Sequence, residues 1–527
     1  MRVSRAIAAV LGLAGLVLSS ASLGCQGDAK GPSLVVRVGR GSDAITLDPA
    51  RATEQDSSEV IEQIFEPLVR YRPDTTDIEP SLAMRWETSE LGRTWTFHLR
   101  PNVLFHDGTP VDADAVVFSF ERQRDSDHPF HRNDFTYWEN TFRTIISSVE
   151  RVDPLTVRIV LEKPYAPFLA TLAMFPVAIV SPTAVKRWKD DFGRHPVGSG
   201  PFRFVEWSPG ERITLEGNLQ YWGGVPHIKS LVFATIADAR QRLVALEGGA
   251  IEVAERLAPQ DLQFVVLHPD LVLHRTDGLN IAYLAMNVKK PPFDNPLVRR
   301  AVNHAVNKQA IVKLVYQGLA RAASSPLPPS FFGYVADDPY PESPKRAEQL
   351  LTEAGWQRDK HPPVKLYVMS SPRAYMPSPL TVARIIQHNL ADIGIEVELV
   401  VSEFDQHLRA VRNGEHDLCL LGWNADNGDP DNVLFTLFDS THVEEGRARN
   451  VAFYTNPLVH GLLQWAQESQ DRREREDYYR RVQRLIQQDA PWVPLAHSQL
   501  VIASKRKLEG LRVHPTNTVI YRLVSER

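Results

Sequence analysis

The sequence has few cysteines and no surplus of basic residues. Of its 527 residues only Cys25 and Cys419 are cysteines, and no C-x-x-C pair occurs, which excludes a zinc site built on cysteine. The 59 basic and 64 acidic residues give a net charge of −5, which does not favour binding to nucleic acid. The patterns H-E-x-x-H, G-x-S-x-G and the P-loop are also absent, so we expect no enzyme activity and no cofactor.

The N-terminus lacks an apolar run long enough to cross a membrane easily. Arg2 and Arg5 precede the apolar residues 6–18, and small residues then lead to Cys25. This pattern resembles a bacterial lipoprotein signal. It predicts a signal peptide over 1–25 that ends at a lipidated Cys25, a tether over 26–32, and a location in the periplasm or at the cell surface. Secretory cleavage near this point without lipid is the alternative.

The chain is too long for a single hydrophobic core and should divide into two or three lobes. An apolar content of 43% and a charged content of 23% are typical of a globular protein. If Cys25 carries lipid, Cys419 stands alone in an apolar stretch, where we expect a buried and unreactive thiol.

Residues 364–432 alternate between two kinds of pattern. Extended apolar runs at 364–370, 395–401 and 417–421 are separated by helical runs at 380–393 and 404–412, and Gly394 and Asn413-Gly414 end those helices. Such alternation predicts parallel strands with crossover helices. Ligands of parallel sheets bind outside the carboxyl ends of the strands.

Two opposite charges follow strands of this unit. Arg373 comes just after the first strand and Asp426 just after the third. A guanidinium suits a carboxylate and an aspartate accepts from an ammonium, so together they would suit a short peptide. The alternative is that both are solvated loop residues. The acidic run 426–431 does not predict a calcium loop, because its third position is Gly428 and its twelfth is Leu437.

Other patterns predict packing. We expect one helix over 297–316, capped by Asp294 or Asn295. The Arg- and Glu-rich residues 472–481 favour a solvated helix face. Trp207, Tyr221 and Trp222 favour the core of a lobe over a platform for stacking a ligand.

Several motifs, in order along the chain, resemble those of the extracytoplasmic solute-binding proteins of peptide-type ABC importers (family 5). They are PSLAMRW at 80–86, WTFHLR at 95–100, FHDG at 105–108, ADAVVFSF at 113–120, GSGPF at 198–202, FD at 293–294 with VRRA at 298–301 and AVNK at 305–308, and GWNADNGDPDN at 422–432. The last motif is the one most specific to the dipeptide-binding branch of this family.

The resemblance implies an α/β, two-lobed periplasmic-binding-protein fold of the large, three-domain type, with mixed sheets and a ligand cleft between the lobes. It implies the following layout: lobe I from 33–76, 201–280 and 500–527, an inserted domain II from 77–200, and lobe II from 281–499. The implied partners are a small peptide, the permease and ATPase of an ABC importer, and the membrane through a lipid anchor. The binding protein itself is expected to be a monomer.

The resemblance also implies roles for five residues. Asp426 would receive the ammonium of the peptide and Arg373 its carboxylate, while Tyr375, Gly422 and Trp423 would line the pocket. Ser440 and Phe453 stand where some relatives have a disulfide, so the loop 439–450 is free to differ in shape. An oligopeptide, a nickel chelate, glutathione, haem or an opine are alternative ligands for the same scaffold. A structural or receptor lipoprotein without a transport role is the alternative of another class.

Overall fold

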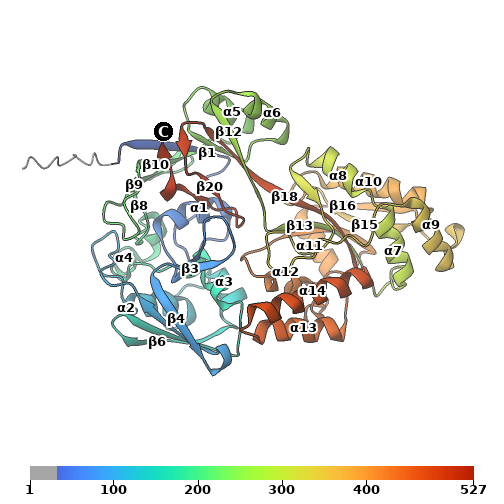
Figure 1. Ribbon diagram of the computed structural model, residues 1–527, viewed down its shortest axis with the longest axis horizontal. Helices are drawn as coiled ribbons and strands as arrows, with labels where there is room; N and C mark the ends of the chain where they lie inside the picture. Colours follow the sequence, from blue (N-terminus) through green and yellow to red (C-terminus); the bar gives the residue numbers. More distant parts are fainter. Residues whose placement is uncertain (1–31) are drawn as a thin grey trace, which may run out of the picture. The chain divides into compact units, whose positions relative to one another are not determined.

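The computed structural model describes residues 32–527, which form one compact unit (Figure 1). The predicted signal peptide with its lipidated Cys25, and the tether apart from Pro32, lie outside the described residues. Among residues 32–527, no helix has both the length and the hydropathy needed to cross a membrane. Cys419 in this part of the chain is a buried free thiol, as predicted.

A mixed sheet of 12 strands runs through this unit. The strands on its main path, from one edge to the other, are β16 (Val397–Ser402), β15 (Val364–Met369), β17 (Leu418–Asn424), β13 (Asn280–Met286), β18 (Trp492–Lys505), β11 (Val253–Glu255), β1 (Leu34–Arg40), β10 (Ile228–Thr235), β9 (Arg212–Gly217) and β8 (Phe202–Ser208). β12 (Leu271–Asp277) and β14 (Ala320–Ala322) also pair with β18.

The long strand β18 joins the two halves of this sheet. Its first residues pair with β13, where Val493 lies opposite Leu284, and its last residues pair with β11, where Ser504 lies opposite Val253. Figure 1 shows β18 running from the side of β1 and β12 to the side of β13. The sequence did not predict this strand, because Pro494 and the polar residues 497–499 interrupt its apolar pattern.

The alternating unit of 364–424 is confirmed. β15, α10 (Pro379–Asp392), β16, α11 (Phe404–Arg412) and β17 follow one another, and β15 pairs in parallel with both β16 and β17. Gly394 and Gly414 have φ angles of 83° and 70°, which glycine adopts without steric cost. β17 also pairs antiparallel with β13, so the predicted α/β class with mixed sheets is confirmed.

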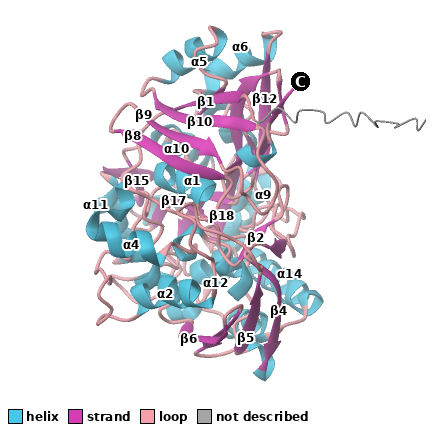
Figure 2. Ribbon diagram, turned by 90° about the vertical axis from the view of Figure 1, so that its left-hand side faces the viewer, coloured by secondary structure: helices cyan, strands magenta, loops and turns pink. Residues whose placement is uncertain are grey.

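The remaining elements cover this sheet or form smaller sheets. A four-stranded sheet consists of β4 (Ala83–Ser89), β5 (Thr94–Leu99), β7 (Thr156–Leu161) and β6 (Ile146–Asp153), with α2 (Ala113–Arg124) packed against β6 (Figure 2). Three two-stranded sheets are β2 (Val69–Tyr71) with β3 (Ile78–Pro80), β19 (Leu508–Glu509) with β22 (Ser525–Glu526), and β20 (Arg512–Val513) with β21 (Val519–Ile520). The other helices are α1 (Gln55–Ile64), α3 (Phe168–Leu172), α4 (Pro182–Trp188), α5 (Ala239–Glu247), α6 (Leu262–Leu267), α7 (Pro296–Ala305), α8 (Lys308–Val315), α9 (Pro344–Glu353), α12 (Asp431–Phe438), α13 (Pro457–Glu468) and α14 (Arg472–Asp489).

The predicted single helix over 297–316 is wrong. The chain leaves the helix at Val306, and Asn307 begins α8 by accepting a hydrogen bond from the Ala310 backbone N–H. An asparagine within a helical pattern can compete with the backbone in this way and start a new helix. Asn295 caps α7 as expected, by accepting from the Leu297 N–H.

Buried apolar side chains form three large clusters in residues 32–527. The largest draws on residues between 279 and 496, the second on 34–65, 178–253 and 502–524, and the third on residues between 50 and 179. All three belong to one compact unit, and the boundaries of lobe I, domain II and lobe II stay a prediction.

Candidate functional site

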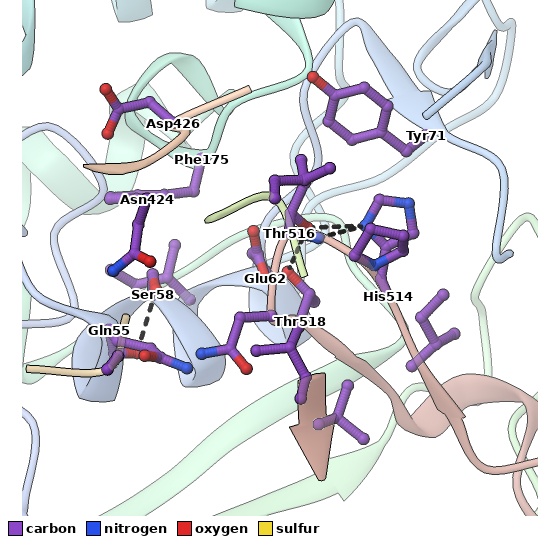
Figure 3. Close-up of a pocket in the computed structure, with 18 of the residues that line it drawn as sticks. Gln55, Ser58, Glu62, Tyr71, Phe175, Asn424, Asp426, His514, Thr516 and Thr518 are labelled. Carbon is purple, nitrogen blue, oxygen red and sulfur yellow. Dashed lines mark hydrogen bonds between the residues drawn. The ribbon is translucent and has the colours of Figure 1, made fainter. Parts of the chain in front are cut away.

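A cavity in the described part of the chain has a volume of about 940 Å3 (Figure 3). This is within the range of pockets that hold small ligands. Its walls come from segments that are far apart in the sequence: 53–71 with α1, 173–178, 372–377, 424–426, 498–501 and 514–522.

Arg373 and Asp426 both line this cavity. Arg373 lies in a tight turn after β15, closed by two backbone hydrogen bonds of 3.0 and 2.9 Å with Met376. Asp426 follows β17, and its backbone N–H donates to the side-chain oxygen of Asn432 at 3.1 Å. Because β15 and β17 are parallel neighbours, the loops that follow them meet at one edge of the sheet, as the sequence predicts.

The guanidinium of Arg373 is oriented by an aromatic ring. Its central carbon lies 3.6 Å from the centroid of Phe404, at the start of α11, which is a favourable cation–π geometry. No acidic side chain that the structure describes lies within salt-bridge distance of it, and its Nε has no hydrogen-bond partner among the described residues. The positive charge of Arg373 is therefore available to a ligand.

The carboxylate of Asp426 is open to the cavity but surrounded by protein walls. This surrounding raises the pKa of Asp426 by disfavouring the charged form, while hydrogen bonds from Asn432 and Tyr137 and the more distant charge of Arg449 act in the opposite direction. The Tyr137 hydroxyl donates to its Oδ1 at 3.4 Å. No basic side chain in the described part of the chain forms a salt bridge with Asp426. An ammonium group would supply the missing positive charge.

The other three predicted residues lie behind the wall of the cavity. The ring of Tyr375 is buried against Gly422 of β17, where a Cβ would collide with it. The Tyr316 hydroxyl donates to the Tyr375 carbonyl at 2.6 Å, and burial raises the pKa of Tyr375 to about 12. The Trp423 indole donates to Asn432, the residue that also holds the Asp426 backbone. Tyr375, Gly422 and Trp423 thus support the two charged loops, and none of the three is among the residues that line the cavity.

The rest of the acidic run has a structural role. Asp429 accepts two hydrogen bonds from the buried Arg475, at 2.7 and 2.8 Å. The prediction of a solvated helix face over 472–481 is therefore wrong at Arg475, which is buried although the residues around it are charged. Asp431 accepts from Tyr165 at 3.0 Å and from Gln467 at 3.0 Å, and burial raises its pKa to about 7.

The opposite wall of the cavity was not predicted. It carries Glu62 of α1, Tyr71 of β2, and His514, Thr516 and Thr518 near β20 and β21 (Figure 3). The one available signal was the acidic residues at 59, 62 and 66, which interrupt an apolar helical pattern.

Glu66 at this wall accepts from three neutral donors, and the Arg70 guanidinium lies 4.0 Å from its Oε1. Tyr221 and Trp222 donate to its carboxylate at 2.8 and 2.9 Å, and Ser199 at 2.9 Å. Tyr221 is buried as expected, but it also forms part of the cavity wall.

The chain is similar to known proteins over most of its length. Residues 77–445 match the model for bacterial extracellular solute-binding proteins, family 5 Middle. The dipeptide-binding protein of Escherichia coli (strain K12) is 35% identical over 483 residues, which cover 88% of each chain. Heme-binding protein A of Haemophilus influenzae is 36% identical over 453 residues, covering 83% of this chain and 82% of that protein.

A solved structure extends this similarity to the fold. The ABC transporter-associated periplasmic binding protein DppA from Helicobacter pylori, in complex with the peptide STSA, matches with a TM-score of 0.75 at 34% identity. The match covers 94% of this chain and 98% of that one. It confirms the periplasmic-binding-protein fold expected from the sequence.

Proposed function

The chain belongs to family 5 of the bacterial extracellular solute-binding proteins, and from this premise we propose that it captures short peptides, chiefly dipeptides, for an ABC importer. It is a binding protein and not an enzyme. In this proposal the chain encloses the peptide in the 940 Å3 cavity and delivers it to a permease driven by ATPase subunits. A lipid on Cys25 would hold it at the membrane.

One observation carries the proposal: two opposite charges that form no salt bridge in the described part of the chain line the same cavity. Asp426 is the site for the peptide ammonium and Arg373 the site for its carboxylate. A peptide that enters the cavity loses water from both ends, so each end needs a fixed countercharge. Hydrogen bonds to the peptide backbone would not depend on side chains, so many sequences of one length could bind.

Haem is the second candidate ligand, because a haem-binding protein of Haemophilus influenzae is as similar as the dipeptide-binding protein of Escherichia coli. Haem carries two carboxylates and no ammonium. It would use Arg373 but would leave Asp426 facing no positive charge. Because Asp426 forms no salt bridge in the described part of the chain, it favours a peptide, which brings an ammonium group, over haem.

The two candidates are separated by direct titration. The purified protein is unfolded and refolded to remove bound material, then titrated with a neutral dipeptide by calorimetry and with haemin by absorbance. We expect the dipeptide to bind with a Kd below about 10 μM and haemin to bind at least about tenfold more weakly. Tight haemin binding without dipeptide binding would replace the proposal by the haem function. Mass spectrometry of material that copurifies with the protein provides an independent check.

A further inference from the structure

Some charged side chains that line the cavity are already paired within the protein. Arg256 donates to Asp56 at 2.8 Å and to Glu59 at 3.0 Å, and Arg70 donates to Glu79 at 2.8 Å. Such residues can contribute little to a ligand, because their charges are neutralised by neighbours.

Glu62 differs from these residues. It projects from α1 into the wall that Figure 3 shows, near Thr516 and Thr518, and its side chain is half-buried. No basic side chain of residues 32–527 forms a salt bridge with it. The hydroxyl of Thr518 lies beside its carboxylate (Figure 3) and carries no charge that would compensate that of Glu62.

The groups around Glu62 do not supply a positive charge. His514 uses both ring nitrogens, one with the Thr516 hydroxyl at 2.7 Å and one with the Thr75 carbonyl at 2.8 Å. Burial lowers the pKa of His514, so it is neutral at physiological pH. Glu59 on the same helix adds a second negative charge, and burial together with this charge raises the pKa of Glu62 to about 7.

Arg522 also lines the cavity and forms no salt bridge in the described part of the chain. Its charged neighbours include Arg70, Glu66 and Glu79. Burial raises the pKa of Tyr71, and the nearby charge of Glu62 adds a smaller effect in the same direction. The Tyr71 ring stacks on His514 with centroids 5.3 Å apart. Glu62 is thus bordered by hydroxyl groups and by an aromatic pair.

We propose that Glu62 receives a cationic side chain of the bound peptide, so that the protein prefers peptides with one lysine, ornithine or arginine residue. This inference rests on the proposed function and adds a third charge contact to Asp426 and Arg373. The carboxylate of Glu62 and the hydroxyls of Thr516 and Thr518 can accept the donors of an ammonium group. The aromatic pair offers an apolar surface for the methylene stem of such a side chain.

The test compares ligands that differ only in one charge. Gly-Lys and Lys-Gly are titrated by calorimetry at pH 8 beside the same dipeptides with an Nζ-acetylated lysine. The wild type should bind at least one lysine dipeptide about tenfold or more tightly than its acetylated form. Glu62→Gln should abolish this preference and change the affinity for the acetylated form by less than about twofold.

A matched control and a pH series complete the test. Glu87→Gln removes an exposed carboxylate of the four-stranded sheet and should leave every affinity unchanged. Lowering the pH from 8 to 6 protonates Glu62 and should reduce the preference in the wild type, but not in Glu62→Gln. Thermal unfolding checks that each variant is folded.

The possible outcomes separate this inference from the proposed function. In one outcome, the Nζ-acetylated dipeptides bind in a way that depends on Asp426 while the protein shows no preference for free lysine. This result would overturn the role of Glu62 and leave the proposed function in place. Equal weakening of all dipeptides by Glu62→Gln would also overturn it, because Glu62 would then bind the terminal ammonium or support the cavity. Absence of binding for every peptide would overturn both.

Discussion

Asp426→Asn should weaken the binding of free dipeptides and spare N-acetylated ones. The substitution keeps the size of the side chain, and the Asp426 backbone N–H still donates to Asn432, so the loop should keep its shape. A peptide ammonium enclosed without its countercharge costs about 2–5 kcal/mol, which corresponds to roughly 30- to several-thousand-fold in affinity. Because the Asp426 side chain is open to the cavity, we expect a loss of affinity near or somewhat below the lower end of this range, of at least about tenfold.

Calorimetric titration of one dipeptide and its N-acetyl derivative provides the assay. The acetylated ligand should bind the wild type weakly and should lose little further affinity in the variant, because it has no ammonium to pair. The free dipeptide should also bind less tightly as the pH falls, since the raised pKa of Asp426 brings its protonation closer to neutral pH. If Asp426→Asn weakens both ligands equally, or neither, Asp426 does not receive the ammonium.

Four further predictions follow. Arg373→Met should weaken a free dipeptide at least about tenfold in calorimetry but leave its C-terminal amide unchanged; equal effects on both would exclude a carboxylate clamp. Wild-type protein should bind tripeptides more weakly than dipeptides, since Arg373 closes the carboxyl end; equal affinities would refute this length selection. Gly422→Ala should lower the free energy of unfolding in urea by about 1–3 kcal/mol, because the methyl group collides with the ring behind it, and an unchanged midpoint would contradict this packing. Burial raises the pKa of Asp431 from an ordinary value of 3.8 to about 7, so the folded chain stays protonated at this residue up to a higher pH than the unfolded chain. The free energy of unfolding therefore falls as the pH rises from about 4 to about 7. Asp431→Asn should reduce that fall when urea midpoints are measured from pH 4 to pH 8, and an identical pH profile would show that the carboxyl does not cause it.

The part of the fold that sequence predicts best is the alternating unit 364–424. Its strands and helices are short, regular and separated by Gly394 and Gly414, so local pattern and tertiary packing agree. The parallel order of its strands also predicts that Arg373 and Asp426 share one cavity, although neither residue is near the other in sequence.

Other parts depend on contacts that no local pattern reveals. The break at Asn307 is favoured by its own cap and by the side chain of Asn389, which accepts from the Asn307 backbone N–H. Strand β18 is held by partners on both halves of the large sheet, which compensate for its polar residues. Arg475 is buried because Asp429, from a distant loop, pairs with it.

Some parts of the candidate site can also be predicted from the sequence, and others cannot. The loops after β15 and β17 are predictable because a parallel sheet fixes where they end. The wall with Glu62, His514 and Thr518 is not, because it joins the N-terminal helix α1 to the last residues of the chain. The positions of Tyr375 and Gly422 follow from how closely the ring and the strand pack, which sequence spacing does not determine.

The central claim is that the two ends of a peptide meet Asp426 and Arg373 inside the cavity. A crystal structure of the protein with a bound dipeptide tests it most directly. The account predicts the peptide ammonium within about 3 Å of the Asp426 carboxylate and the peptide carboxylate within about 3 Å of the Arg373 guanidinium. A dipeptide bound elsewhere, or bound in the cavity with either end turned away from these two residues, would contradict it.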